Sequence, residues 1–162
     1  MNTREKILPL EPLAGALAEE RRRGRRIVLA NGCFDLLHAG HVRFLEGARR
    51  EGDVLVVAIN SDASERQLKG AGRPVLAAGA RAELVAALAA VDYVVVFEEA
   101  DVSRLLERLR PDVHGKGTDY TPDSVPESAL SRRLGIRVAI VGDPKRHSSK
   151  DLIERIRAMN HV

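Results

Sequence analysis

Two histidines three positions apart are the side chains in this sequence best suited to chemistry. His38 and His41 lie in the segment NGCFDLLHAGH, residues 31–41, directly after an apolar run. If a helix starts near Ala39 or Gly40, both imidazoles project near its N-terminus, where free backbone N–H groups and the positive dipole end attract anions. Gly40 lacks a Cβ and lets a phosphate or a base approach the backbone. The segment therefore predicts a site for phosphoryl or nucleotidyl transfer, reactions that need positioned reactants and stabilised phosphorus oxygens.

The histidine pair admits two other interpretations. A His-x-x-His spacing can place two metal ligands on one helix face, but no third ligand is evident nearby and the intervening glycine is not required for that purpose. Two incidental surface histidines explain the bare pair but not the NGxFD context after a strand. Cys33 has no evident partner for nucleophilic catalysis, and we expect it to be a small core residue.

The elements that must position this segment alternate along the chain. Short apolar runs typical of strands cover residues 25–30, 54–60, 92–97, 111–115 and 136–142. Amphipathic segments typical of helices cover residues 12–23, 41–52, 80–91, 101–110, 124–135 and 148–159. This alternation predicts an α/β fold with a mainly parallel sheet covered on both faces, because parallel neighbours need a crossover connection. Ligands then bind at the carboxyl ends of the strands.

Two connections are longer than a compact domain requires. They cover residues 61–78, after the second expected strand, and residues 116–123, after the fourth. Loops of this length inside a compact domain are often functional. We therefore expect both to contribute to the ligand site.

Composition narrows the class of protein. The chain has 162 residues, which is typical of one domain, and 26 basic against 23 acidic residues give a formal charge of +3. This small excess suits a phosphorylated ligand without requiring nucleic acid. The five Phe and Tyr residues, with no Trp, argue against base stacking on an aromatic surface. We interpret the basic run at residues 21–26 as a solvated helix end, with a phosphate or nucleic-acid patch as the alternative.

Cysteine usage and hydropathy predict the compartment. A single cysteine permits no intramolecular disulfide and no multi-cysteine zinc site. The N-terminus lacks the apolar segment of a signal peptide, and no stretch approaches about 18 uninterrupted apolar residues. We expect a cytoplasmic protein with no membrane partner.

The segment NGCFDLLHAGH resembles the G-x-F-D-x-x-H-x-G-H motif of the HIGH-type nucleotidyltransferase superfamily, in its cytidylyltransferase-like branch. AINSDASERQLKGAGRP, AAVDYVVVFEE, VHGKGTDY and SSKDLIERI resemble, in matching order, the adenylyltransferase domain of bacterial ADP-heptose synthesis. The similarity covers residues 27–156. It implies a Rossmann-like nucleotidyltransferase fold with a five-stranded parallel sheet, strand order 3-2-1-4-5, and helices on both faces. Residues 1–25 are then an N-terminal helical extension, and residues 26–162 are the nucleotidyltransferase domain.

The resemblance also implies a role for each matching residue. His38 and His41 are the expected catalytic residues, which contact the phosphates and stabilise the transition state. The implied nucleotide-binding residues are Asn31, Gly32, Cys33, Phe34, Gly40, Lys116, Ser148 and Ser149. The implied acceptor-binding residues are Asp35, Asp62, Lys69, Arg73, Arg81, Asp119 and Tyr120. For Asp35 the alternative is to orient its own loop, and for Lys69 and Arg73 it is a solvated loop charge.

The chain departs from the family pattern near its last expected helix. The family uses Ser-Thr-Thr for the triphosphate, whereas this chain has Ser148, Ser149 and Lys150. Lys145, Arg146 or Lys150 are candidates to supply the missing contact. Ser148 with Asp151 is also typical of a helix N-cap. His114 is expected to be structural, at a strand end.

The implied reaction is transfer of AMP from ATP to a sugar 1-phosphate, D-glycero-β-D-manno-heptose 1-phosphate, with release of pyrophosphate. Mg²⁺ is expected to be carried with the nucleoside triphosphate. The alternative is a cytidylyltransferase that uses CTP and glycerol 3-phosphate or another polyol phosphate. A nucleotide-binding regulatory module without turnover is a third hypothesis, against which the intact histidine pair argues. We expect a homodimer and no nucleic-acid partner.

Overall fold

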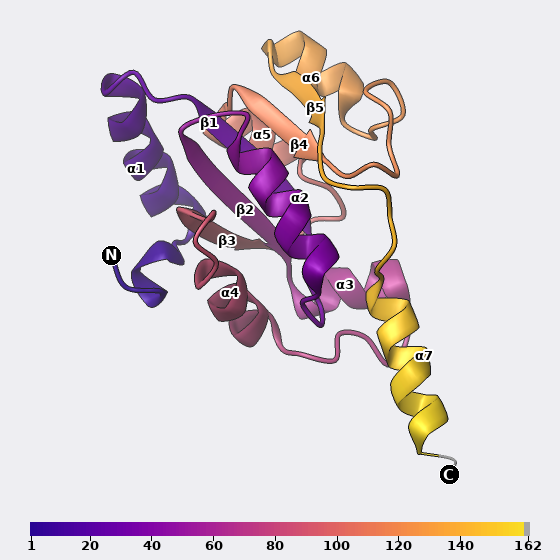
Figure 1. Ribbon diagram of the computed structural model, residues 1–162. Coiled ribbons are helices and arrows are strands. Elements are labelled where there is room, and N and C mark those ends of the chain that lie inside the picture. The colour runs from indigo at the N-terminus through magenta and orange to yellow at the C-terminus, as the bar shows by residue number, and fades with distance from the viewer. Residues whose placement is uncertain (161–162) are drawn as a thin grey trace.

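A five-stranded parallel sheet forms the centre of the molecule. The computed structural model describes residues 1–160, and its strands run in the order β3-β2-β1-β4-β5 (Figure 1). This order confirms the predicted 3-2-1-4-5 topology. The strands are β1 (Ile27–Gly32), β2 (Val54–Asn60), β3 (Tyr93–Phe97), β4 (Val113–Lys116) and β5 (Arg137–Ile140).

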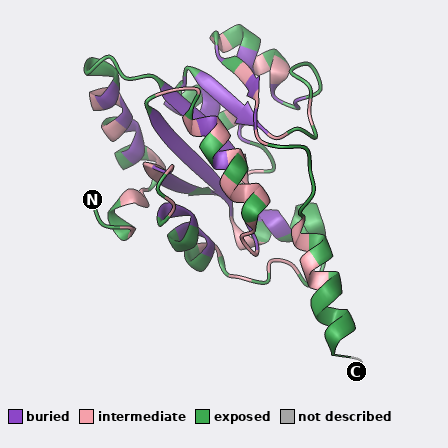
Figure 2. Cartoon of the chain, viewed as in Figure 1, coloured by how far each residue is buried: buried purple, intermediate pink, exposed green. Residues whose placement is uncertain are grey.

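Helices cover both faces of the sheet, as predicted. One hydrophobic cluster joins the sheet to α2 and α4, and the other joins it to α1 and α5. Every residue of β2 is buried (Figure 2), which explains its unbroken apolar sequence, because a strand covered on both faces has no solvent side. The helices are the short 3₁₀ turn η1 (Arg4–Lys6), α1 (Leu10–Arg22), α2 (Ala39–Arg49), α3 (Asp62–Lys69), α4 (Ala78–Ala86), α5 (Ser103–Leu109), α6 (Ser128–Leu134) and α7 (Ser149–Met159).

The connection predicted as a loop over residues 61–78 was partly wrong, because its first half is α3. The hydroxyl of Ser61 accepts the backbone N–H of Ser64 at 3.2 Å and caps the helix. Acidic residues occupy the first turn, basic residues the last, and Gly70 follows with φ at 91°. These start and stop signals are local in the sequence, so the helix was predictable from them although the segment was interpreted as a loop.

Residues 1–25 are attached to the rest of the chain through α1. Leu13 and Leu17 are fully buried in the cluster that also contains residues of β1 and α5. Arg21 donates to the carbonyl oxygens of Leu109 and Arg110, at the C-terminal end of α5. This part of the predicted solvated arginine run therefore caps a neighbouring helix.

Within residues 1–160, no helix combines the length and apolar character needed to span a bilayer.

A buried network of charges joins α3 and α4 to the loop after β1. The guanidinium of Arg81, whose side chain has 0% exposure, lies 2.9 Å from Glu65 and 2.8 Å from Asp62. Glu65 has no exposed side-chain surface either, and its other oxygen lies 3.3 Å from the guanidinium of Arg73. Arg73 in turn donates to Asp35 at 3.0 Å. The network fixes the position of the α3–α4 connection relative to the histidine segment.

Replacing Arg81 tests whether this network supports the fold. We expect Arg81→Met to lower the free energy of unfolding by about 3–5 kcal/mol, because Glu65 then remains buried without its closest cation. The matched control is Arg104→Met, which breaks a 2.7 Å pair with Glu99 whose side chains are 69% and 37% exposed. The control is expected to cost less than about 1 kcal/mol. Urea denaturation measures both, and equal losses would contradict the structural role of the network.

Candidate active site

The loop from β1 to α2 has an unusual backbone that brings its side chains inward. Phe34 and Leu36 have φ values of 53° and 54°, in the left-handed region that non-glycine residues rarely adopt. The Phe34 ring is buried, and its centroid lies 5.2 Å from that of His41. A Cβ on Gly32 would lie 3.1 Å from the Phe34 ring, so a larger residue where the strand ends would crowd this ring. The loop is therefore shaped by packing beneath the two histidines.

His38 and His41 form a stacked pair at the N-terminus of α2. His38 is the N-cap residue, and the ring centroids are 3.8 Å apart with an interplanar angle of 19°. The backbone N–H of His38 donates to Nδ1 of His41 at 3.4 Å. Because Nδ1 accepts this bond, the neutral His41 ring carries its proton on Nε2. His41 thus offers one N–H donor close to a helix N-terminus, where an anion binds favourably.

Both imidazoles are held in the neutral form. Burial lowers the pKa of His41 to about 4, and the neighbouring His38 and Lys145 act in the same direction. Burial also lowers the pKa of His38, with His147 and Lys145 contributing. At neutral pH these groups are therefore uncharged hydrogen-bond donors, and the positive charge at the site comes from lysines and the helix dipoles.

His147 joins the pair from the other end of the chain, and sequence reasoning missed it. Its ring centroid lies 6.2 Å from that of His38. A Cβ on Gly40 would lie 3.0 Å from the His38 ring and 3.5 Å from Cβ of His147. Gly40, expected to make room for a ligand, thus also makes room for the protein's own side chains. No pattern near residue 147 signals this contact, because its partners are more than a hundred residues away.

The N-terminus of α7 lies beside that of α2 (Figure 1). Ser148 caps α7 by accepting the backbone N–H of Asp151 at 3.0 Å, which confirms the predicted N-cap. Ser149 donates its hydroxyl proton to the backbone carbonyl of Asp35, so α7 is attached to the histidine loop. Lys145 pairs with Asp119 at 2.8 Å. Its charge contributes to the lowered pKa values of both α2 histidines. Two helix N-termini and a nearby ammonium group together give an electrostatic environment that favours an anion.

The end of β4 contributes a buried cation. The ammonium of Lys116 lies 4.5 Å from the centre of the Tyr120 ring, a cation–π arrangement. Burial lowers the pKa of Lys116, although the carboxylate of Glu127 opposes this shift. Thr118 donates to the carbonyl of Asp143 at 3.0 Å, so the segments after β4 and β5 are joined. The structure thus places Lys116 against Tyr120, and Asp119 against Lys145, which precedes α7.

The hydrogen bonds of Asp35 favour the alternative interpretation, in which this residue orients its own loop. They attach that loop to the α3–α4 connection. Its carboxylate accepts the backbone N–H groups of Val75 at 2.7 Å and Leu76 at 3.0 Å, and the Arg73 guanidinium at 3.0 Å. Burial alone would raise the pKa of Asp35, but these donors outweigh it and lower that pKa. The carboxylate is buried and already satisfied, so it has little capacity left to bind an acceptor.

The expected substrate contact of Arg81 needs correction. Its guanidinium has no exposed surface, and besides Asp62 and Glu65 it donates to the carbonyls of Leu76 and Cys33 at 2.9 and 2.7 Å. Arg81 therefore supports the site from within the protein. Glu65, its buried partner, was not predicted, because a glutamate in an apparent loop gives no sign of burial. Asp62 and Lys69 remain more accessible, at the two ends of α3.

The single cysteine does not provide a nucleophile. The Cys33 thiol donates to the side-chain oxygen of Asn60 at 3.7 Å. Burial raises the pKa of Cys33 to about 11, with Glu65 acting in the same direction. The thiol is protonated at neutral pH, so it is not activated for attack. The expected core position of Cys33 was wrong, because its side chain is only partly buried.

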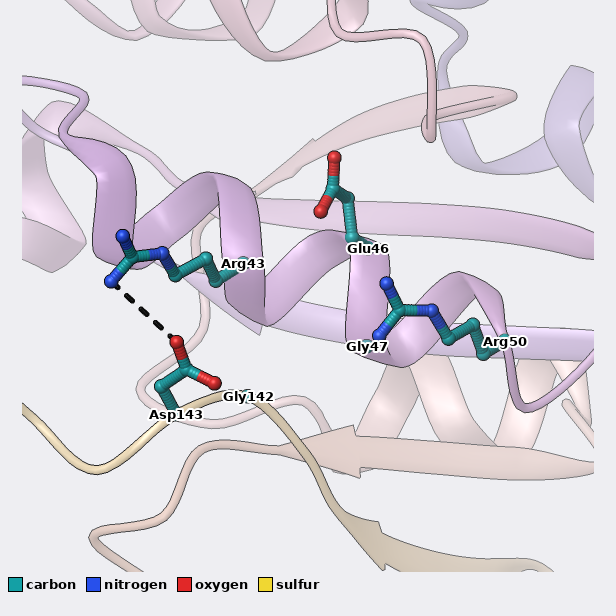
Figure 3. Close-up of a pocket in the computed structure, with 6 residues that line it drawn as sticks. All are labelled: Arg43, Glu46, Gly47, Arg50, Gly142 and Asp143. Carbon is teal, nitrogen blue, oxygen red and sulfur yellow. Dashed lines mark ion pairs between the residues drawn. The ribbon is translucent and has the colours of Figure 1, made fainter.

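A shallow polar depression of about 290 Å³ lies along α2, beyond the histidines (Figure 3). Arg43 of α2 pairs across it with Asp143, which follows β5, at 3.5 Å. A Cβ on Gly47 would lie 3.0 Å from the backbone nitrogen of Gly142, so α2 and the segment after β5 are in close contact. None of the lining residues belongs to the predicted site: Arg43, Glu46, Gly47, Arg50, Gly142 and Asp143. The depression marks where the segment leading to α7 is held against α2.

Comparison with known proteins gives consistent matches. The chain is 49% identical over 151 residues to the Bifunctional protein HldE of Syntrophotalea carbinolica, covering 93% of this chain and 31% of that protein. The HldE protein of Pseudomonas paraeruginosa is 46% identical over 151 residues, covering 93% and 32%. The chain thus spans about a third of the length of these curated relatives.

A solved structure and a family model complete the comparison. The lipopolysaccharide core biosynthesis protein from Thermoplasma volcanium matches with a TM-score of 0.65 and 25% identity, covering 75% of this chain and 100% of that one. The family model described as Cytidylyltransferase-like matches residues 29–155, which include the histidine segment, strands β2 to β5, most of β1 and the first part of α7. Together with the resemblance carried by NGCFDLLHAGH, this match establishes that the chain belongs to the cytidylyltransferase-like family.

Proposed function

We propose that this protein transfers AMP from ATP to a sugar 1-phosphate, D-glycero-β-D-manno-heptose 1-phosphate, to give an ADP-sugar and pyrophosphate. The observation that carries the proposal is the stacked pair of His38 and His41 at the N-terminus of α2, beside the capped N-terminus of α7. The resemblance to the adenylyltransferase domain of bacterial ADP-heptose synthesis supports the choice of substrates. The HldE relatives support it as well.

The reaction is a direct displacement at the α-phosphorus. A phosphate oxygen of the acceptor forms the new O–P bond while the bond from the α-phosphorus to the bridging oxygen breaks, and pyrophosphate leaves with the electron pair. The nucleophile is already ionised, so the site needs no strong general base. The Nε2–H of His41 and the N–H groups at the start of α2 stabilise the negative charge that develops on the phosphate oxygens.

The lysines hold the anions around this centre. Lys145 lies beside the histidines, and Lys150 lies in the first turn of α7, where the family has a threonine. We propose that these ammonium groups neutralise the triphosphate and the pyrophosphate product. Asp119, which pairs with Lys145, sets the position of that ammonium group.

We propose that Mg²⁺ enters the site bound to the triphosphate. Mg²⁺ usually keeps several waters and binds substrate phosphates together with one or two carboxylates. Among residues 1–160, no three side chains of the His, Cys, Asp and Glu types are grouped so as to hold a metal. We propose that the ion is delivered on the nucleotide and keeps its coordination to the phosphates and to water.

A substrate assay tests the proposed reaction. We expect purified protein with Mg²⁺ to release pyrophosphate fastest from ATP with heptose 1-phosphate, compared with CTP and with glycerol 3-phosphate. Faster release with CTP would replace the adenylyl transfer by cytidylyl transfer while leaving the histidine site in place. No release from any nucleotide and acceptor pair would overturn the proposed function.

Substitution of His41 tests the role of its donor. We expect His41→Ala to lower kcat by about 100-fold or more, the loss typical of removing one donor to a developing oxyanion. His41→Gln retains an N–H donor of similar reach and should lose less. Arg104→Ala, on the exposed surface, serves as the control and should leave kcat unchanged. Circular dichroism establishes that each variant is folded. Equal rates for His41→Ala and the control would contradict the proposed role.

A further inference from the structure

A histidine outside the motif makes a direct contact with the expected nucleotide site. His114 lies in β4 and has 0% exposure, and its Nε2 lies 2.9 Å from the side-chain oxygen of Asn31. Asn31 is in β1, adjacent to Gly32 and the histidine loop. The two strands are neighbours in the sheet (Figure 1), and Leu29 of β1 lies opposite His114 in the register. Because side chains alternate along a strand, Leu29 and Asn31 share one face of the sheet.

The other ring nitrogen of His114 fixes the direction of this bond. Nδ1 is buried and has no hydrogen-bond partner within the described residues. A buried N–H without an acceptor is less tolerable than a nitrogen lone pair without a donor. The neutral ring therefore carries its proton on Nε2, which donates to Oδ1 of Asn31. Burial lowers the pKa of His114 to about 3, with Lys116 contributing, so the ring is uncharged at neutral pH.

Stability does not explain a histidine at this position. A buried polar ring with an unpartnered nitrogen costs free energy that an apolar side chain of similar size would avoid. The adjoining positions of β4 and β1 are filled by apolar residues such as Val113 and Leu29. The histidine ring therefore lowers the stability of the fold relative to an apolar side chain, and its one hydrogen bond is made to Asn31.

The bond determines which group Asn31 presents at the end of the strand. Because Oδ1 accepts from His114, the two N–H donors on Nδ2 lie on the opposite side of the same planar amide. Asn31 is only partly buried, and no protein acceptor within residues 1–160 forms a hydrogen bond with Nδ2. The exposed end of Asn31 is thus a donor, which suits an oxygen or nitrogen acceptor of a ligand.

We propose that His114 is a positioning residue for the nucleotide: its Nε2–H holds the Asn31 amide so that the Nδ2 donors bind an acceptor atom of the nucleoside triphosphate. The inference rests on the proposed function, because it takes the ligand to be a nucleotide. His114 itself touches no substrate, and it acts only through Asn31.

Kinetics of paired variants test the coupling. We expect His114→Leu to lower kcat/KM for the nucleotide by about 10-fold or more, the loss expected when one hydrogen bond to a charged ligand is misplaced. KM for the acceptor should be unchanged. The urea midpoint should be equal to that of the wild type or higher. His114→Gln retains a donor and should recover most of the loss. Adding His114→Leu to Asn31→Ala should cost less than about twofold, because the second substitution has nothing left to position.

Two further measurements keep the inference open to refutation if His114→Leu does not fold. Asn31→Asp still accepts from His114 but lacks the Nδ2 donors, so it should be stable and should bind Mg·ATP about 10-fold or more weakly in calorimetry without acceptor. Nitrogen NMR of the wild-type imidazoles should show the Nε2–H tautomer for His114. Wild-type affinity in Asn31→Asp, a proton on Nδ1, or additive losses in the double variant would each overturn the inference.

The outcome separates this inference from the proposed function. If wild-type protein binds and turns over ATP while the His114 and Asn31 variants behave like wild type, only the positioning role fails. If wild-type protein neither binds Mg·ATP nor releases pyrophosphate, the proposed function fails, and the positioning role fails with it.

Discussion

The site depends on the hydrogen bonds that join Asp35 to the α3–α4 connection and to the start of α7. Its carboxylate accepts three donors from residues 73–76, and its backbone carbonyl accepts the hydroxyl of Ser149. One residue of the histidine loop therefore fixes both the α3–α4 connection and the start of α7. These bonds act together with the contact between His38 and His147 and the pair between Arg43 and Asp143, which also hold the start of α7 close to α2.

The loop itself is held by charges that lie underneath it. Arg81 and Arg73 pair with Glu65 and Asp35, whose side chains have no exposed surface, and Arg81 also pairs with the partly exposed Asp62. Such a network is costly to bury and stabilises only when every partner is present, so it gives the loop one well-defined position. The left-handed backbone of Phe34 and Leu36 is tolerated because the surrounding contacts outweigh its strain. Rigidity at this point is the property that an in-line displacement requires.

The distribution of charge separates two tasks within the site. His38 and His41 are neutral donors at its centre, where the pKa of His41 is lowered to about 4 by burial. Lysines occupy more exposed positions: Lys145 precedes α7 and Lys150 lies in its first turn. In the proposed reaction, the neutral donors favour the transition state by orientation, whereas the outer cations attract the phosphorylated substrates from solution. Lys116 is the exception, a buried cation stabilised by Tyr120 and Glu127.

The sequence by itself determined the alternation of strands and helices, the strand order through the family resemblance, and the histidine pair at a helix start. These features depend on local periodicity and on short motifs, which are readable residue by residue. Only the tertiary structure decided that Arg81 lies inside the protein, that Glu65 is buried, that His147 faces His38 and that His114 binds Asn31. Each of these contacts joins residues from different elements, and burial of a charged or polar side chain depends on the partners that folding brings to it, which no local pattern records.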